Sequence, residues 1–139
     1  MSTTRLRATP KYFIAAFGEK YASAHPVHGG EYPLGRLSNR YSYIMKGDVM
    51  LLYCTGSYVG HYMEAPAVGV IVDTETSAKE YTLHYRYLQL SEPVPRDTIN
   101  SSIGAVEKDY FINPGANFIF EIASTSFQAT LKGRYINWP

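Results

Sequence analysis

The chain has 139 residues, a single cysteine and a formal net charge of +1. This length suffices to bury a core without disulfides or metal, and one cysteine excludes an internal disulfide. The sequence has no apolar run of about eighteen residues and no charged-then-apolar leader, so we expect a cytoplasmic protein without a membrane span.

The small net charge conceals an asymmetry along the chain. The first 46 residues carry seven basic and two acidic side chains, whereas the remainder carries six basic and ten acidic ones. A basic first third indicates affinity for a polyanion if its cations gather on one face. Alternatively, the early arginines belong to a solvated leader. Residues 1–10 lack periodicity and are expected to form a flexible tail before a single domain at 11–139.

The first half of this domain is predicted to begin with a strand and continue as a loop. Residues 11–17 are dense in aromatic and aliphatic side chains, which indicates a strand. Short helical turns are expected at 19–24 and 40–44. Between them, the segment 25–39 contains several glycines and prolines and is read as an irregular loop. Loops of this length are more often functional than accidental.

The stretch at 46–54 is the element around which the chain is organised. Lys46, Gly47 and Asp48 have the chemistry of a tight turn. The run from 49 to 54 is apolar without alternation, which favours a strand covered on both faces. Cys54 ends this run and is therefore read as a small buried hydrophobe rather than a nucleophile.

Three further strands and one helix are expected in the second half. Residues 67–72 form another apolar run, followed by an expected turn at 73–76, and residues 81–90 alternate tyrosine and leucine with polar side chains. Pro93 and Pro95 are expected to end that strand. The segment 98–117 is weakly patterned. A last strand is predicted at 118–122, and a helix at 126–132 is expected to be capped by Ser124 or Thr125. Five strands with little helix predict a small β-barrel.

Catalytic and metal-binding patterns are weak. His25 and His28 are three residues apart, but Pro26 prevents helical convergence and no cysteine or carboxylate cluster accompanies them, so we expect no metal. The serines and histidines lack the glycine pattern of a nucleophile elbow, and no Walker or dinucleotide glycine motif is present. We therefore predict no cofactor and no catalytic residue, and a single loop histidine is read at most as a ligand contact.

Aromatic residues at strand ends are the remaining signal. Phe17, Tyr53 and Tyr58 fall where predicted strands end, and Asn39 lies in the polar loop. Aromatic rings can stack on a planar heterocycle whose edge is read by an amide or hydroxyl. Each of these aromatics is individually more often core than ligand contact, and for Tyr53 the core interpretation is favoured.

The order of these elements resembles the EVE domain of the PUA-like superfamily. The resemblance rests on Tyr12-Phe13-Ile14-Ala15-Ala16-Phe17, on Lys46-Gly47-Asp48 leading into Val49 to Tyr53, and on Ala67-Val68-Gly69-Val70-Ile71-Val72. Leu88 to Val94 and the closing Phe120-Glu121-Ile122 are also similar. It implies a mainly β (α+β) fold, a PUA-like pseudo-barrel of five to six strands with a few short helices. The family commonly has a tryptophan near the first loop, whereas Trp138 lies at the far end here.

EVE domains, like the related YTH and SRA folds, bind a modified nucleobase in an aromatic-lined pocket. The resemblance therefore implies a non-catalytic module that accommodates a modified base of DNA or RNA. The residues expected to line the base-binding pocket are Phe17, Asn39, Tyr41, Tyr53, Ser57 and Tyr58. Phosphate contacts are expected from Arg36, Arg40 and Lys46, and possible further ligand contacts from His28, Tyr21 and Tyr32.

Two other interpretations stay open at this level. An ASCH-like hydrolase or nuclease on the same fold would use Lys20, Glu31 or His28 as acid or base. A small-molecule or protein-binding module would instead present its tyrosines to a partner. A pocket that gathers Phe17, Tyr53 and Asn39 favours the base reader, and a buried lysine–glutamate pair favours the enzyme.

Overall fold

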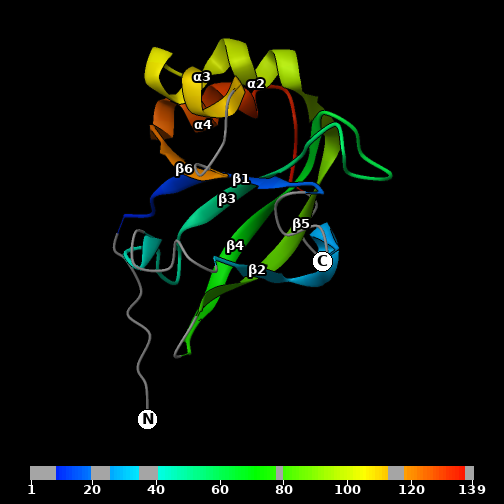
Figure 1. The fold of residues 1–139 in the computed structure, drawn as a ribbon. Helices are drawn as coiled ribbons and strands as arrows, with labels where there is room; N and C mark the ends of the chain where they lie inside the picture. Colours follow the sequence, from blue (N-terminus) through cyan, green and yellow to red (C-terminus); the bar gives the residue numbers. More distant parts are fainter. Residues whose placement is uncertain (1–8, 20–25, 35–40, 78–79, 113–117, 137–139) are drawn as a thin grey trace.

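The chain is built around one six-stranded sheet with its labelled α-helices on one side (Figure 1). The computed structural model describes residues 9–19, 26–34, 41–77, 80–112 and 118–136. The strands are β1 (Tyr12–Phe17), β2 (Glu31–Pro33), β3 (Val49–Cys54), β4 (Glu64–Thr76), β5 (Tyr81–Pro95) and β6 (Ile119–Ile122), in the order β2-β5-β4-β3-β1-β6. The helices are η1 (Val27–Gly29), α2 (Arg96–Ser102), α3 (Ala105–Ile112) and α4 (Ser124–Thr130).

Strands β1 and β3 form the parallel centre of this sheet. They pair from Tyr12 opposite Val49 to Phe17 opposite Cys54, and β4 and β6 add antiparallel neighbours on either side. From its second residue onward each of the two central strands is buried. The apolar run at 49–54 therefore lies in a strand covered on both faces, as its lack of alternation predicted.

The turn before β3 is held by a buried carboxylate. Gly47 adopts a φ of 96°, a left-handed conformation that favours glycine. Asp48 is fully buried, and its two oxygens accept the backbone N–H groups of Lys11 at 3.0 Å and of Met45 at 3.0 Å. The predicted turn is confirmed, and Asp48 also ties it to the start of β1.

The core consists of two clusters, one on each face of the sheet, because successive side chains of a strand point in opposite directions. In β1, Phe13 and Phe17 belong to one cluster with Leu52 and Cys54 of β3. Ile14 belongs to a second cluster, which includes Phe111 of α3. Helices α2, α3 and α4 lie together on the side of this second cluster (Figure 1). Successive residues of a strand point to opposite faces, so each central strand contributes to both clusters.

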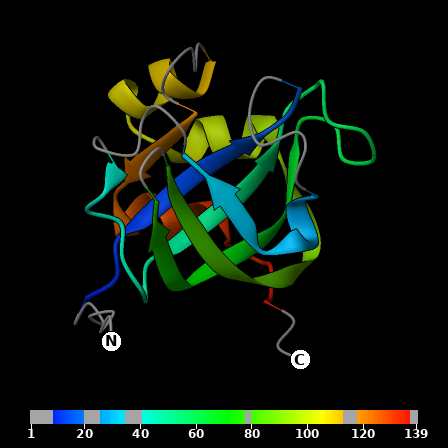
Figure 2. The same cartoon turned by 60° about the horizontal axis from the view of Figure 1, so that its bottom comes forward.

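The sheet curls until its two edges approach each other. Figure 2 shows β2 crossing in front of the curled sheet. Tyr32 of β2 donates its hydroxyl to the carbonyl oxygen of Ala16 in β1 at 2.8 Å, and lies 3.3 Å from that of Phe118. Register shifts in the β4–β5 pairing, at 65–67 and 71–73, are of the kind that bends strands. The predicted fold class, mainly β with a pseudo-barrel of five to six strands and short helices, is confirmed in this architecture.

Several predicted boundaries are wrong. The expected turn at 73–76 is part of β4, and β5 continues through Pro93 to Pro95 instead of ending before them. Proline is tolerated where a strand residue need not donate to a neighbour. Strand β2 was missed because it is only three residues long and lies in a stretch rich in glycine and proline.

The helices differ most from the sequence-based prediction. Helices α2 and α3 occupy most of the segment described above as weakly patterned, and α2 buries just Ile99, which leaves little periodicity to detect. Helix α4 begins at Ser124, two residues earlier than predicted. Its N-cap is Ala123, which makes no side-chain cap, so neither Ser124 nor Thr125 has the expected capping role.

Some predictions fall on residues outside the described ranges. These include residues 1–8 of the N-terminal tail, residues 20–24 of the expected helical turn, and residues 25 and 35–39 of the loop. Within the described ranges, no helix is long and apolar enough to cross a membrane. The single domain at 11–139 stays a prediction.

Candidate functional site

The candidate site lies where the parallel strands β1 and β3 end. The N–H of Thr55 donates to the carbonyl oxygen of Phe17 at 2.8 Å, so the two strands remain paired to their last residues. Gly18 follows Phe17. A Cβ on Gly18 would lie 2.1 Å from Thr55 Oγ1 and 2.7 Å from Ser57 Oγ, distances that real side chains do not tolerate. Glycine at 18 therefore lets the two hydroxyls approach the backbone after β1.

The Ser57 hydroxyl links the ends of β1 and β3 by hydrogen bonds. Its Oγ accepts the backbone N–H of Glu19 at 2.7 Å and lies 3.0 Å from Thr55 Oγ1. The segment then turns, because the N–H of Tyr58 donates to the carbonyl oxygen of Thr55 at 3.0 Å. Ser57 is exposed, so its hydroxyl is positioned but accessible.

An aromatic cluster lies beside these strand ends on the face opposite helices α2, α3 and α4. Phe17 is its centre: the Phe17 ring centroid is 5.0 Å from that of Tyr32, and 6.4 Å from those of Tyr58 and Tyr85. All three contacts are close to edge-to-face, a favourable arrangement for aromatic rings. We call Phe17, Tyr32, Tyr58, Tyr85, Tyr87 and His28 the aromatic cluster.

Two tyrosine hydroxyls of this cluster hold η1 against the sheet. The Tyr58 hydroxyl accepts the N–H of Val27 at 2.8 Å, and the Tyr85 hydroxyl donates to the carbonyl oxygen of Val27. The N–H of Tyr85 also donates to Gly30, whose φ of 85° closes the turn after η1. Because both polar groups of Val27 are used, η1 is anchored to two separate parts of the fold.

The cluster has an accessible edge. His28 is exposed, and its ring centroid lies 6.4 Å from that of the partly exposed Tyr87 in an edge-to-face contact. Tyr58 is also partly exposed. Burial raises the pKa of Tyr87 and that of Tyr85, so both phenols are neutral at physiological pH. A neutral aromatic edge with hydroxyl groups beside it is suited to a planar, polar-edged ligand.

The predicted convergence of Phe17 and Tyr53 on one pocket is wrong. Phe17 belongs to the cluster on the face that η1 covers, whereas Tyr53 lies on the face of α2, α3 and α4, with its ring centroid 4.7 Å from that of Phe111. The two residues are at the same ends of paired strands but one position out of phase, so their side chains point to opposite faces. Tyr53 is a core residue, as the alternative interpretation favoured.

Three predicted contact residues are buried on the face of the aromatic cluster. Phe17 and Tyr32 have no exposed surface, and Tyr41 is 4% exposed. Among the described residues predicted to contact the base, Ser57, Tyr58 and His28 are accessible.

The predicted phosphate contact Lys46 lies away from this site. Lys46 is exposed in the turn before β3, whereas the candidate site follows the other end of that strand. Six strand residues span about 17 Å. Arg36, Arg40, Asn39 and Tyr21 lie outside the described residues, so their predicted roles are untested.

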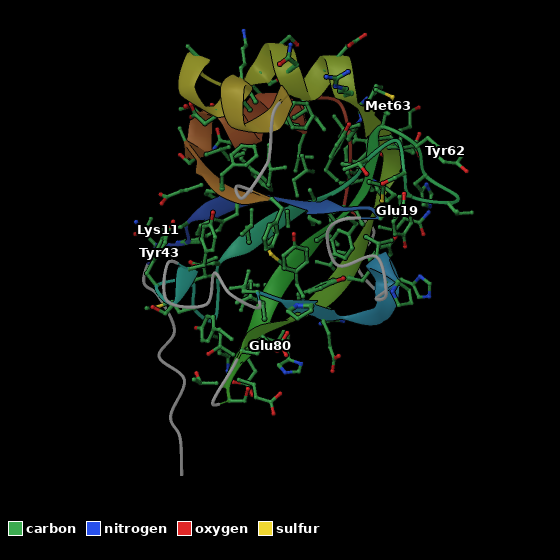
Figure 3. All side chains as sticks on the ribbon, viewed as in Figure 1. Lys11, Glu19, Tyr43, Tyr62, Met63 and Glu80 are labelled. Atoms are coloured by element: carbon green, nitrogen blue, oxygen red, sulfur yellow. The ribbon has the colours of Figure 1, made fainter. Side chains whose placement is uncertain are left out.

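Of the acid–base candidates, Lys20 lies outside the described residues, and Glu31 faces a histidine on the neighbouring strand. Glu31 lies 3.9 Å from His84 on the neighbouring strand, and His84 is 3.0 Å from Glu75. The Lys–Glu pair found within the described part of the chain, Lys11–Glu121 at 3.6 Å, is substantially exposed, and Figure 3 places Lys11 at the opposite end from Glu19. Among the described residues, no group of three histidine, cysteine or acidic side chains is placed to hold a metal ion.

Cys54 ends β3 beneath the site, and its thiol is expected to be unreactive. Burial, with a smaller contribution from Glu64, raises its pKa to about 12, so the thiolate needed for nucleophilic attack is scarce. We expect the native protein to resist a thiol-specific reagent at mildly alkaline pH and to react with one equivalent after unfolding in guanidinium. Rapid labelling of the folded chain would contradict this assignment.

Sequence reasoning missed Tyr85, Tyr87 and Gly18 as parts of the site. The available signal for the tyrosines was the alternation along 81–87, which correctly places both on one side of β5. Nothing in the sequence pairs β5 with η1. Gly69 of β4 leaves room for the ring of Tyr85, because a Cβ at position 69 would lie 2.7 Å from that ring.

Comparisons with known proteins do not extend this description. A scan against protein-family models, a search of curated proteins and a search of solved structures each found no match. The resemblance to EVE domains therefore stays a prediction, and the site is defined by its own geometry: an aromatic cluster with an accessible edge at the carboxyl ends of two parallel strands.

Proposed function

We propose that this protein is a non-catalytic nucleic-acid-binding module that accommodates a modified nucleobase at the accessible edge of the aromatic cluster. The observation that carries the proposal is the pair of partly exposed rings, Tyr58 and Tyr87, packed against an otherwise buried aromatic group. Their rings would stack on the base, and the exposed side chains of Ser57 and His28 would hydrogen-bond its edge.

Energetics favours a base that is already accessible. Extracting a base from a duplex costs a few kcal/mol, and stacking on aromatic side chains returns about 1–3 kcal/mol per base. A methyl or hydroxymethyl substituent adds apolar surface that can be buried among the rings. Discrimination between modified and unmodified bases then comes from this added surface, since the stacking itself tolerates any base.

Replacement of the Tyr87 ring tests the proposal. Affinity is measured for oligonucleotides carrying methylcytosine, hydroxymethylcytosine or methyladenine, beside unmodified controls, as DNA and as RNA. We expect Tyr87→Ala to weaken binding to the preferred modified strand by about 1–3 kcal/mol, because one stacking surface is lost. Tyr87→Phe keeps the ring and is expected to bind like the wild type.

Thermal unfolding of each variant separates a binding role from a structural one. Tyr87→Ala must remain folded at the assay temperature, and its loss must be larger for the modified strand than for the unmodified one. Tyr58→Phe provides a second comparison, because it keeps the ring but removes the acceptor for the Val27 N–H. Equal binding of modified and unmodified strands by the wild type would overturn the proposal.

A further inference from the structure

The loop between β3 and β4 exposes an unusual group of apolar side chains. Val59 is 82% exposed, Tyr62 is 58% exposed and Met63 is 44% exposed. We call residues 59–63 the apolar loop. Figure 1 shows it projecting from the body of the protein, and Figure 3 places Tyr62 and Met63 at the same end as Glu19, beside the candidate site.

Both ends of the apolar loop are fixed by hydrogen bonds. Before it, Tyr58 is held through its backbone N–H by Thr55 and through its hydroxyl by Val27. At its other end, the carbonyl oxygen of Met63 accepts the N–H of Arg96 at 3.0 Å, and His61 Nδ1 lies 2.9 Å from Oε2 of the following Glu64. The loop is therefore anchored at both ends while its apolar side chains remain in solvent.

Met63 is held in an unfavourable backbone conformation. Its φ is 56°, and among the described residues it is the one position other than glycine with a positive φ. Such strain persists where surrounding contacts impose it, and it is found most often at functional sites. The Met63 side chain also packs near Gly56, with its Cγ 3.7 Å from where a Cβ would lie. The structure thus maintains a particular shape in a loop whose side chains are exposed.

We infer that the apolar loop is a wedge that enters a nucleic-acid duplex next to the base held by the aromatic cluster. This inference rests on the proposed function. A base that leaves a duplex leaves a gap in the stack, and apolar side chains inserted between base steps fill such gaps in other proteins. Tyr58 immediately precedes the loop, so the base-holding ring and the wedge are joined in one short segment.

The size and charge of the loop favour a duplex over a protein partner. A stable protein interface buries about 800 Å² on each partner, whereas Val59, Tyr62 and Met63 offer the area of a few side chains. The Glu64 carboxylate is paired with His61, so this acidic group next to the loop is not left as an isolated negative charge. A small apolar tip whose neighbouring carboxylate is already paired fits a base step, where an isolated anion would be repelled by the phosphates.

The test compares duplex and single-stranded forms of one oligonucleotide, chosen as the best binder among strands with methylcytosine, hydroxymethylcytosine or methyladenine. The variant carries Val59→Ala and Tyr62→Ala together. We expect its affinity for the duplex to fall about tenfold or more, because the gap is no longer filled. Affinity for the single strand is expected to stay within about twofold, as for ordinary surface substitutions.

Tyr43→Ala is the matched control, because Tyr43 is a partly exposed tyrosine at the opposite end of the molecule (Figure 3). It should alter neither affinity. Equal losses on duplex and single strand, or no loss on the duplex, would overturn the wedge while leaving base binding intact. If the double variant changes the self-association of the protein but neither oligonucleotide affinity, the apolar loop binds a protein instead. If the wild type binds no strand of the panel, both the wedge and the proposed function fail.

Discussion

Asp48→Ala is expected to destabilise the protein strongly, by about 2–5 kcal/mol in the free energy of unfolding. The carboxylate is fully buried and accepts two backbone N–H groups, those of Lys11 and Met45. Alanine leaves both donors without their acceptor, and each such loss costs about 1–3 kcal/mol. Urea unfolding followed by circular dichroism measures the change.

Asp48→Asn separates the hydrogen bonds from the packing. Asparagine keeps the shape and one acceptor oxygen but presents an NH₂ group to the second donor, so an intermediate loss is expected. Asp73→Ala, at an exposed position of β4, should change the unfolding free energy by less than about 0.5 kcal/mol. A loss for Asp48→Ala no greater than that for Asp73→Ala would show that the carboxylate does not hold the turn.

Phe17→Ala is expected to cost about 3–5 kcal/mol of stability, the range for truncating a buried phenylalanine. Phe17 is fully buried, and the rings of Tyr32, Tyr58 and Tyr85 all pack on it. Its removal leaves a cavity in the middle of the aromatic cluster. Binding of modified and unmodified oligonucleotides should therefore fall together, in proportion to the fraction of protein unfolded.

The contrasting result would restore Phe17 to the base-binding role that its place at the end of the first strand suggested. In that case Phe17→Ala would lose affinity for the modified strand while the unfolding midpoint stayed near that of the wild type. Phe17→Leu serves as the control, because it fills most of the volume and should cost less than the alanine variant. Unfolding and affinity are measured on the same protein preparations.

The central strands illustrate how much local sequence can determine. The run 49–54 was identifiable as a strand because it is apolar on both faces, and the preceding turn because Gly47 and Asp48 have specific backbone roles. Tyr85 and Tyr87 were placed on one side of their strand by alternation alone. These features depend on residues close together in the chain, where period and turn chemistry are informative.

The candidate site was harder to predict because it is assembled from distant segments. Phe17 and Tyr53 both end predicted strands, but the parallel register of β1 and β3 puts them one position out of phase and on opposite faces. The sequence does not reveal that register. The contacts of Tyr58 and Tyr85 with Val27 join residues 31 and 58 positions apart, which no local pattern reports.

The sequence by itself determined the mainly β fold class, the buried strands at 12–17 and 49–54, and the turn at Gly47, because periodicity and backbone preference act over a few residues. Tertiary structure alone decided which aromatics became accessible. Curling of the sheet buried Phe17 and Tyr32 and left Tyr58 and Tyr87 at the edge, while Gly69 leaves room for the Tyr85 ring, whose hydroxyl binds Val27 of η1. Exposure is a property of packing between distant segments, so no residue's identity fixes it in advance.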